Sequence, residues 1–266
     1  MSADDIEKQP LLAPQQSPIQ IRPASLADAG LLASIVLQSF RNAPFYDWMH
    51  ATRPDATPEE KKRVHEELYK HRLAVTKRQL CDPKISVYVA LHNGQRAAFA
   101  MWAVQPGTET PHYLPQRRRQ SSLYEKVSRL WYKVVDYFFT WVPDRLQTAI
   151  WFPTVGPLYL ERRRILMQRQ AETIEKFIAK EDREQGYKLL YILATLPEYE
   201  KKGIGSKLLK QGLEEAREDQ ASVYLGATPA GKPLYLKNGF EVVGIDTKGE
   251  PGVCTWDETL MKWRAA

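Results

Sequence analysis

A glycine-bearing loop late in the chain has the residue types to bind a phosphate group. Before it, residues 189–193 form a short apolar run of strand formers that ends before Pro197, which predicts a buried strand. After it, apolar residues recur at spacings of three and four from Ile204, which predicts an amphipathic helix. Gly203 and Gly205 would let a ligand approach the backbone N–H groups at that helix N-terminus, where the helix dipole favours negative charge. The pattern therefore predicts a phosphate or pyrophosphate site.

Other phosphate-binding loops, and a loop that only closes a turn, fit parts of the same pattern. No Gly-Lys-Ser or Gly-Lys-Thr follows at the spacing of a Walker loop, and the third glycine of a dinucleotide-binding fingerprint is absent. Two glycines after a strand are also common in turns without a ligand. Taken alone, the loop does not separate these alternatives.

A second stretch, Leu-Tyr-Leu-Lys-Asn-Gly-Phe at residues 234–240, follows the glycine-bearing loop by about thirty residues. With it, the chain resembles the GNAT superfamily of N-acetyltransferases. Residues 195–205, Thr-Leu-Pro-Glu-Tyr-Glu-Lys-Lys-Gly-Ile-Gly, are similar to the acyl-CoA loop of that family, whose core is Gln/Arg-x-x-Gly-x-Gly/Ala. Glu200 stands where the family usually has Gln or Arg, and a carboxylate beside a pyrophosphate is repulsive. Lys201 and Lys202 can offset that repulsion.

The resemblance implies an α/β fold, with a mixed central sheet splayed at its middle and helices on both faces. It implies an acyl-CoA-dependent N-acyltransferase, with acetyl-CoA as the expected cosubstrate, an amine as acceptor, direct attack in a ternary complex and no metal. Leu193 and Thr195 would hold the pantetheine arm through their backbone groups. The pyrophosphate would be bound by Glu200, Lys201, Lys202, Gly203, Ile204, Gly205 and Ser206.

Tyr235 would be the general acid that protonates the leaving thiolate. Without the resemblance, the same tyrosine reads as a packed aromatic side chain with a bonded hydroxyl. The strand at 189–195 holds neither Glu nor His, so the general base is unassigned, with Asp47 and His50 as candidates. Both lie in the aromatic stretch 45–50, which either lines the acceptor pocket or packs its rings on the core.

The chain length of 266 residues suits one large domain, and a hydrophobic fraction of 43% is enough for a core. We expect a disordered tail at 1–18 and a single domain at 19–266. Cys81 and Cys254 provide neither a disulfide framework nor metal-ligand spacing, which favours a reducing, cytoplasmic setting. No apolar run reaches the roughly 20 residues of a membrane span.

An insertion at about 107–170 differs from the rest in composition. Residues 111–170 hold eleven Lys and Arg against four Asp and Glu, in a chain whose net charge is +6. They also hold Trp131, Trp141 and Trp151, and the apolar residues of 123–138 fall on one helical face. Nucleic-acid binding, membrane-surface association, a cover over the acceptor site and a plain core helix are all compatible with this pattern. We favour a core helix that also covers the site.

The remaining elements follow from local signals. Strands are predicted at 19–22, 85–91, 97–104, 221–225, 240–245 and 253–263, and helices at 25–40, 59–80 and from Thr228. Ser25 is the expected N-cap of the first helix, with Asp28 in the capping-box position. Asn93-Gly94 predicts a two-residue hairpin turn.

Two further functions remain open alongside the transferase. A binding or regulatory module could keep the fold and bind acyl-CoA without turnover, and Glu200 favours this alternative. A peripheral membrane or nucleic-acid-binding protein could use the basic insertion. For the transferase we expect a small-molecule amine, no nucleic-acid partner and no membrane span; the oligomeric state is left open.

Overall fold

A computed structural model describes residues 19–41, 43–44, 48, 57–108, 127, 130, 161–162, 165–166, 168–169, 172–173, 176–250 and 254–265. The proposed tail at 1–18, the candidates Asp47 and His50, and most of the insertion at 107–170 lie outside these residues. Within the insertion, Val127 and Leu130 are helical and well exposed to solvent. Exposure of these two side chains does not support the predicted packing of that helical face in the core.

The described elements alternate between strands and helices along the chain. The N-terminal part contains β1 Gln20–Pro23, the 3-10 turn η1 Leu26–Asp28, α1 Ala29–Ser39, α3 Pro58–Cys81, β2 Ile85–His92 and β3 Gln95–Pro106. The C-terminal part contains α7 Lys180–Gln185, β4 Gly186–Thr195, η2 Pro197–Tyr199, α8 Ile204–Glu218, β5 Val223–Ala227, α9 Lys232–Lys237, β6 Glu241–Glu250 and β7 Cys254–Trp263.

The described strands form one seven-stranded mixed sheet in the order β1-β2-β3-β4-β5-β7-β6. All neighbours are antiparallel except β4 and β5, which are parallel. Those two strands pair only at Lys188 with Val223 and Leu189 with Tyr224. The rest of β4 diverges from β5, so the predicted mixed sheet, splayed at its middle, is confirmed.

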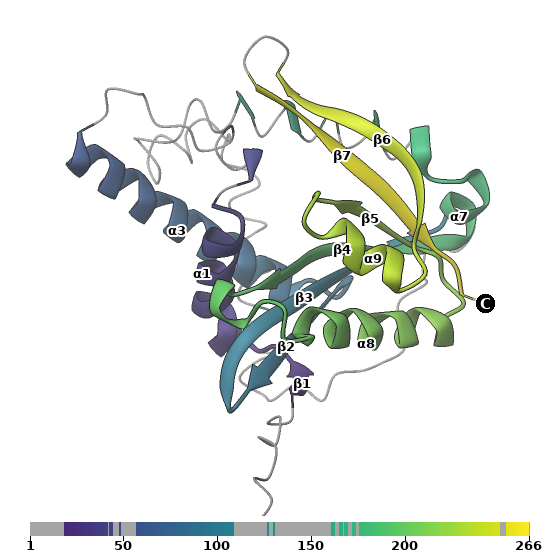
Figure 1. Cartoon of the computed structure of the whole chain (residues 1–266), viewed down its shortest axis with the longest axis horizontal. Coiled ribbons are helices and arrows are strands. Elements are labelled where there is room, and N and C mark those ends of the chain that lie inside the picture. Colours follow the sequence, from purple (N-terminus) through teal and green to yellow (C-terminus); the bar gives the residue numbers. More distant parts are fainter. Residues whose placement is uncertain are drawn as a thin grey trace, which may run out of the picture.

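Helices cover both faces of this sheet. On one face, α8 lies across the middle strands (Figure 1), and its Leu208, Leu209 and Leu213 pack with Leu190, Leu225 and Met261 of the sheet. On the other face, Leu32 and Ile35 of α1 and Leu80 of α3 pack against Val89, Phe99 and Met101. The apolar periodicity of α8 predicted the first of these contacts.

Local signals at the N-terminal end of the domain behave as expected. Ser25 is the N-cap of η1, which leads directly into α1, and the capping box with Asp28 is present. Asp28 is fully buried and also binds Arg22 and Arg96, so it ties the helix start to β1 and β3. Burial alone would raise the pKa of Asp28, but hydrogen bonds from Arg22 and Ser25 outweigh it and lower that pKa to about 2.

The hairpin turn predicted at Asn93-Gly94 is present, and so is the helix predicted from Thr228, although it begins later. Asn93 and Gly94 have φ values of 54° and 74°, the left-handed pair that a two-residue hairpin turn requires. The helix predicted from Thr228 begins later, at Lys232, with Gly231 as its N-cap. Thr228 instead closes the turn before it, because its hydroxyl accepts the backbone N–H of Gly231. The last two strands are as predicted, although β6 extends five residues further, to Glu250.

Candidate active site

The opening in the sheet begins at a β-bulge in β4. Met101 of β3 pairs with Ile192, and the next residue, Trp102, pairs with Leu190, so Tyr191 is the extra residue of the bulge. A bulge bends its strand and increases the local twist. This bend carries the C-terminal half of β4 away from β5 and leaves Tyr191 45% exposed in the middle of the sheet.

The edge of β4 that faces the opening is free to pair with an extended ligand. Leu193 and Thr195 lie on this half of the strand, where β5 provides no pairing residue. The backbone carbonyl of Thr195 already accepts a hydrogen bond of 2.9 Å from Ser39 of α1, which fixes the end of the strand. An extended chain that adds to such an edge gains main-chain hydrogen bonds, as a pantetheine arm would.

The loop after β4 presents an unobstructed helix N-terminus. Gly203 is the N-cap of α8 with a φ of 77°, and it offers no side chain to cap the helix. The first N–H groups of a helix have no intrahelical acceptor, so those of Ile204, Gly205 and Ser206 remain available to a ligand. Lys201 also has a left-handed φ, 59°, which costs a non-glycine residue about 1–2 kcal/mol.

Gly205 lies where three parts of the site meet. A side-chain carbon built at this position would lie 3.7 Å from Leu234 of α9 and 3.8 Å from the Thr195 hydroxyl at the end of β4. The start of α8, the end of β4 and the start of α9 therefore adjoin one another. The two sequence signatures, far apart in the chain, meet here.

The charged residues of the loop are all exposed to solvent. Glu200 follows η2, and Lys201 and Lys202 precede the helix. The ammonium of Lys202 lies 4.9 Å from the ring centre of Tyr199. Because solvent screens exposed charges, the repulsion between Glu200 and a bound anion is worth at most about 1 kcal/mol.

Tyr235 of α9 is buried, with 8% of its surface exposed, and its ring packs edge-on against Phe240 at 5.7 Å. Burial raises its pKa to about 12, so the hydroxyl keeps its proton at neutral pH. Among the described residues this hydroxyl has no hydrogen-bond partner. It is therefore a proton donor without a structural bond to hold it.

Residues 162–242 match the family model for the acetyltransferase (GNAT) domain. That range contains β4, α8, β5 and α9, which are the elements around the opening. This part of the chain is similar to a GNAT domain. A comparison with curated proteins finds no match.

Solved structures of acetyltransferases share the fold of this chain. An arylalkylamine N-acetyltransferase 2 from Aedes aegypti matches with a TM-score of 0.53 at 13% identity, covering 94% of this chain and 100% of its own. A polyamine N-acetyltransferase from Drosophila melanogaster, which forms N-acetylagmatine, matches with a TM-score of 0.52 at 10% identity, covering 93% of this chain and 100% of its own. A Corynebacterium glutamicum protein, "histone acetyltransferase HPA2 and related acetyltransferase", matches with a TM-score of 0.51 at 18% identity, covering 93% of this chain and 97% of its own. At such identities the likeness shows the fold.

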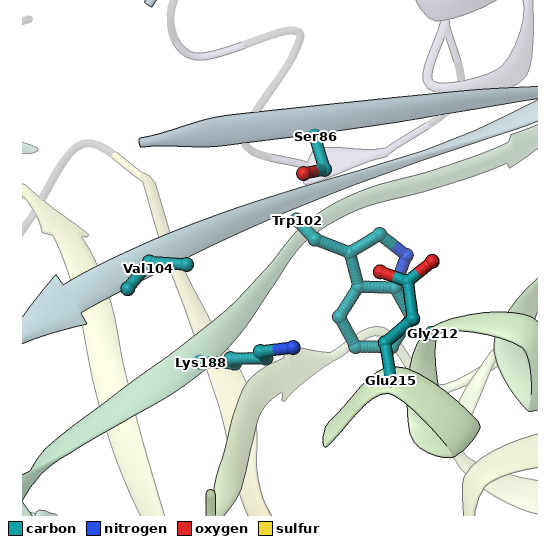
Figure 2. A pocket seen from close by; sticks show the side chains of 6 residues that line it. All are labelled: Ser86, Trp102, Val104, Lys188, Gly212 and Glu215. Atoms are coloured by element: carbon teal, nitrogen blue, oxygen red, sulfur yellow. The ribbon is translucent and has the colours of Figure 1, made fainter. Parts of the chain in front are cut away.

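A small cavity under the sheet belongs to its closed half and not to the opening. Figure 2 shows Trp102 of β3 between Lys188 of β4 and the α8 residues Gly212 and Glu215. The cavity holds about 10 Å³, close to the space of one water molecule, so it is far too small for a CoA arm. A side-chain carbon at Gly212 would lie 2.0 Å from the Trp102 ring. This glycine is therefore required for the packing of the tryptophan.

Three residues at the opening were not singled out from the sequence: Tyr191, Gly226 and Glu258. The bulge at Tyr191 follows from three-dimensional pairing and leaves no mark in the apolar run. Gly226 lies just after the predicted strand 221–225 and within the observed β5, and an isolated glycine in a strand is a signal of close approach by another group. In the structure that group is the carboxylate of Glu258 from β7.

The described residues contain no group of three or more His, Cys, Asp and Glu side chains that could hold a metal ion. In the same part of the chain, no helix is long and apolar enough to cross a membrane.

Proposed function

We propose that this protein is an acetyl-CoA-dependent N-acetyltransferase that acts on a small amine. The observation that supports it most is the opening between β4 and β5, which leads directly to the bare N-terminus of α8. An extended arm could pair with the free edge of β4 while a pyrophosphate accepts hydrogen bonds at residues 200–206. The structural neighbours named for arylalkylamine and polyamine substrates support a small amine as the acceptor.

The reaction in this proposal is a direct transfer in a ternary complex. The nitrogen of the neutral amine attacks the thioester carbonyl, the C–N bond forms, and the C–S bond breaks as the intermediate collapses. The amine loses one proton to water, and the thiolate gains one from Tyr235, whose hydroxyl is protonated at neutral pH. Water then returns a proton to Tyr235, so no net proton is gained or lost by the protein. Holding amine and thioester together supplies much of the rate acceleration.

We keep the domain division as part of the proposal: a tail at 1–18 and one domain at 19–266 with an insertion at about 107–170. We also propose a cytoplasmic location, which the low cysteine content of the chain supports.

A panel of primary amines tests the activity. The protein is incubated with acetyl-CoA and each amine, and the free CoA thiol and the acetylated product are measured together. Amine-dependent thiol release with matching product supports the transferase. Saturable CoA binding with no turnover on any amine would instead support a binding module without turnover, the alternative that Glu200 favours.

A further inference from the structure

Glu258 of β7 places its carboxylate over Gly226 of β5. A side-chain carbon at Gly226 would lie 2.1 Å from the Oε1 atom of Glu258, so only glycine leaves room for this carboxylate. Gly226 itself remains exposed, and the Glu258 side chain keeps 32% of its surface exposed. The carboxylate therefore lies at the surface of the sheet, within reach of a ligand.

The strand register puts this carboxylate at the start of the opening. Lys188 pairs with Val223 and Leu189 with Tyr224, so continued pairing would bring Tyr191 beside Gly226. The strands separate at that level instead, and both residues are exposed. The thioester of a CoA arm that lies along β4 would have to enter the sheet at this place.

Glu258 faces away from α8, on the opposite side of the sheet from the proposed pyrophosphate loop. Met261 and Trp263 of the same strand pack in the α8 cluster, and side chains alternate between the two faces of a strand. Glu258 therefore shares the other face with Tyr224, which packs against Ile178 and Tyr187. An acceptor that approaches from this face would meet the thioester from the side opposite the CoA pyrophosphate.

The charges around Glu258 do not balance. Lys248 of β6 is buried, with its ammonium 2.9 Å from Asp246 and 3.6 Å from Glu258. It also donates to the Thr173 hydroxyl and to the backbone carbonyl of Arg169. Two carboxylates thus share one ammonium, and the nearer one is Asp246.

The two carboxyl groups respond differently to this arrangement. Burial raises the pKa of Glu258, and the attraction of Lys248 offsets this only in part. For Asp246, hydrogen bonds from Thr173 and Lys248 outweigh burial and lower the pKa, with Lys176 adding to the effect. Of the pair, Glu258 is the carboxylate whose charge is least compensated, and a cation would stabilise it.

An aromatic surface lies next to this carboxylate. Trp256 precedes Glu258 by two residues on the same face of β7, about 7 Å along the strand. Its ring lies 5.5 Å from that of Trp48, a buried residue from the stretch after α1. The guanidinium of Arg162 lies over Trp48. A flat apolar group beside Trp256 would place an attached ammonium near Glu258.

We propose that Glu258 binds the ammonium group of the acceptor as it enters the site, before that nitrogen loses a proton and attacks, and that the acceptor is a cationic primary amine with an apolar body. This rests on the acyl transfer proposed above and assigns the part of the site that selects the amine. Glu258 is a specificity-determining residue in this account, since among the described residues a neutral molecule of the same shape would leave it only the ammonium of Lys248, which Asp246 shares.

The test compares tryptamine, which is cationic at neutral pH, with tryptophol, which has a hydroxyl in place of the amine. Their dissociation constants are measured by calorimetry on the protein saturated with CoA, for the natural sequence, Glu258→Gln and Asp182→Asn. Asp182 is the matched control because it binds Lys262 of β7 on the same face but beside the closed half of the sheet. Melting temperatures are recorded for all three proteins.

The natural protein should bind tryptamine more tightly than tryptophol. Glu258→Gln should weaken the affinity for tryptamine by at least about tenfold and leave the affinity for tryptophol unchanged, since only the charge pair is lost. Asp182→Asn should lower the melting temperature with both affinities unchanged. The proposal would be overturned if the natural protein bound the two ligands equally or did not bind tryptamine. It would also be overturned if Glu258→Gln weakened the affinity for both ligands equally. Loss of CoA binding by the natural protein would instead overturn the transferase itself.

Discussion

The two halves of β4 differ in what surrounds them, although they belong to one continuous strand. The half that pairs with β5 is closed, and its Lys188 is buried against Asp219 at 2.5 Å. Its neighbour on β5, Tyr224, donates to Asp182, which also accepts from Lys262. These polar side chains hold the structure together.

The other half, beyond the bulge at Tyr191, has a free edge and leads to a helix N-terminus with no cap. Among the described residues, β5 does not pair with this edge, and the Thr195 carbonyl is held by Ser39. Substitutions in the closed half should therefore reduce stability, and substitutions around the open half should reduce binding or turnover. The predictions below test this division, starting from the largest effect.

Tyr235→Phe should lower turnover by about 10²–10³, since it removes the proposed proton donor and keeps the ring that packs on Phe240. The melting temperature and the affinity for acetyl-CoA should stay nearly unchanged, because the hydroxyl has no partner among the described residues. Tyr224→Phe, in the closed half, is the control. It should lose about 1 kcal/mol of stability through its bonds to Asp182 and Ala179, with turnover intact. Full turnover in Tyr235→Phe would make this tyrosine structural.

Gly212→Ala should lower the free energy of unfolding by about 3 kcal/mol, because the added carbon overlaps the Trp102 ring. Gly205→Ala is the matched glycine at the open half, where the added carbon finds ordinary contact distances. It should leave stability unchanged or raise it by about 0.5–1 kcal/mol, because alanine favours the helix. Urea unfolding measures both. Similar losses at the two positions would remove the distinction between the halves.

Acid stability should come from the N-terminal part of the domain and not from the opening. The pKa of Asp28 is lowered from 3.8 to about 2, so its contribution is complete above the unfolded value and is lost as the pH falls through about 2. The shift corresponds to about 2 kcal/mol. In urea unfolding from pH 7 to pH 2, Asp28→Asn should be less stable at pH 7 and lose less stability below pH 4. Parallel curves for the two proteins would contradict this assignment.

The smallest expected effect is at Glu200, which is exposed beside the helix N-terminus. Glu200→Gln should tighten CoA binding by up to about 1 kcal/mol, or a few-fold, if the carboxylate faces the phosphates. Titrations at low and high salt measure this, and the gain should shrink as salt screens the charge. A gain that is independent of salt would point to a different cause.

Much of this arrangement could be predicted from the sequence because it depends on local patterns. The apolar run at 189–193, the spacing after Ile204, and Asn93-Gly94 each fix an element through its own residues. The left-handed φ at Gly203 could not be predicted from the pattern, and it makes Gly203 unsuitable for a mutational test of ligand binding. Any side chain there strains the backbone, so Gly203 cannot separate binding from folding.

The bulge at Tyr191 and the position of Glu258 depend on pairing between distant strands, which no local pattern records. The start of α9 was placed too early because Thr228 caps a turn in the same way as it would cap a helix. The proposed pyrophosphate contacts and the role of Tyr235 came from the resemblance, and they stay predictions for the experiments above.

The most direct test of the central claim is a CoA titration of the natural protein, Ser206→Asp and Ser206→Asn. Ser206 lies in the first turn of α8, where a carboxylate stabilises the helix but repels a bound pyrophosphate. We predict that Ser206→Asp melts at the same or a higher temperature and binds CoA at least about tenfold more weakly, while Ser206→Asn binds like the natural protein. Damage to the fold cannot make the protein more stable while it weakens the affinity for CoA. Equal CoA affinity in all three folded proteins, or no saturable binding by the natural one, would contradict the account.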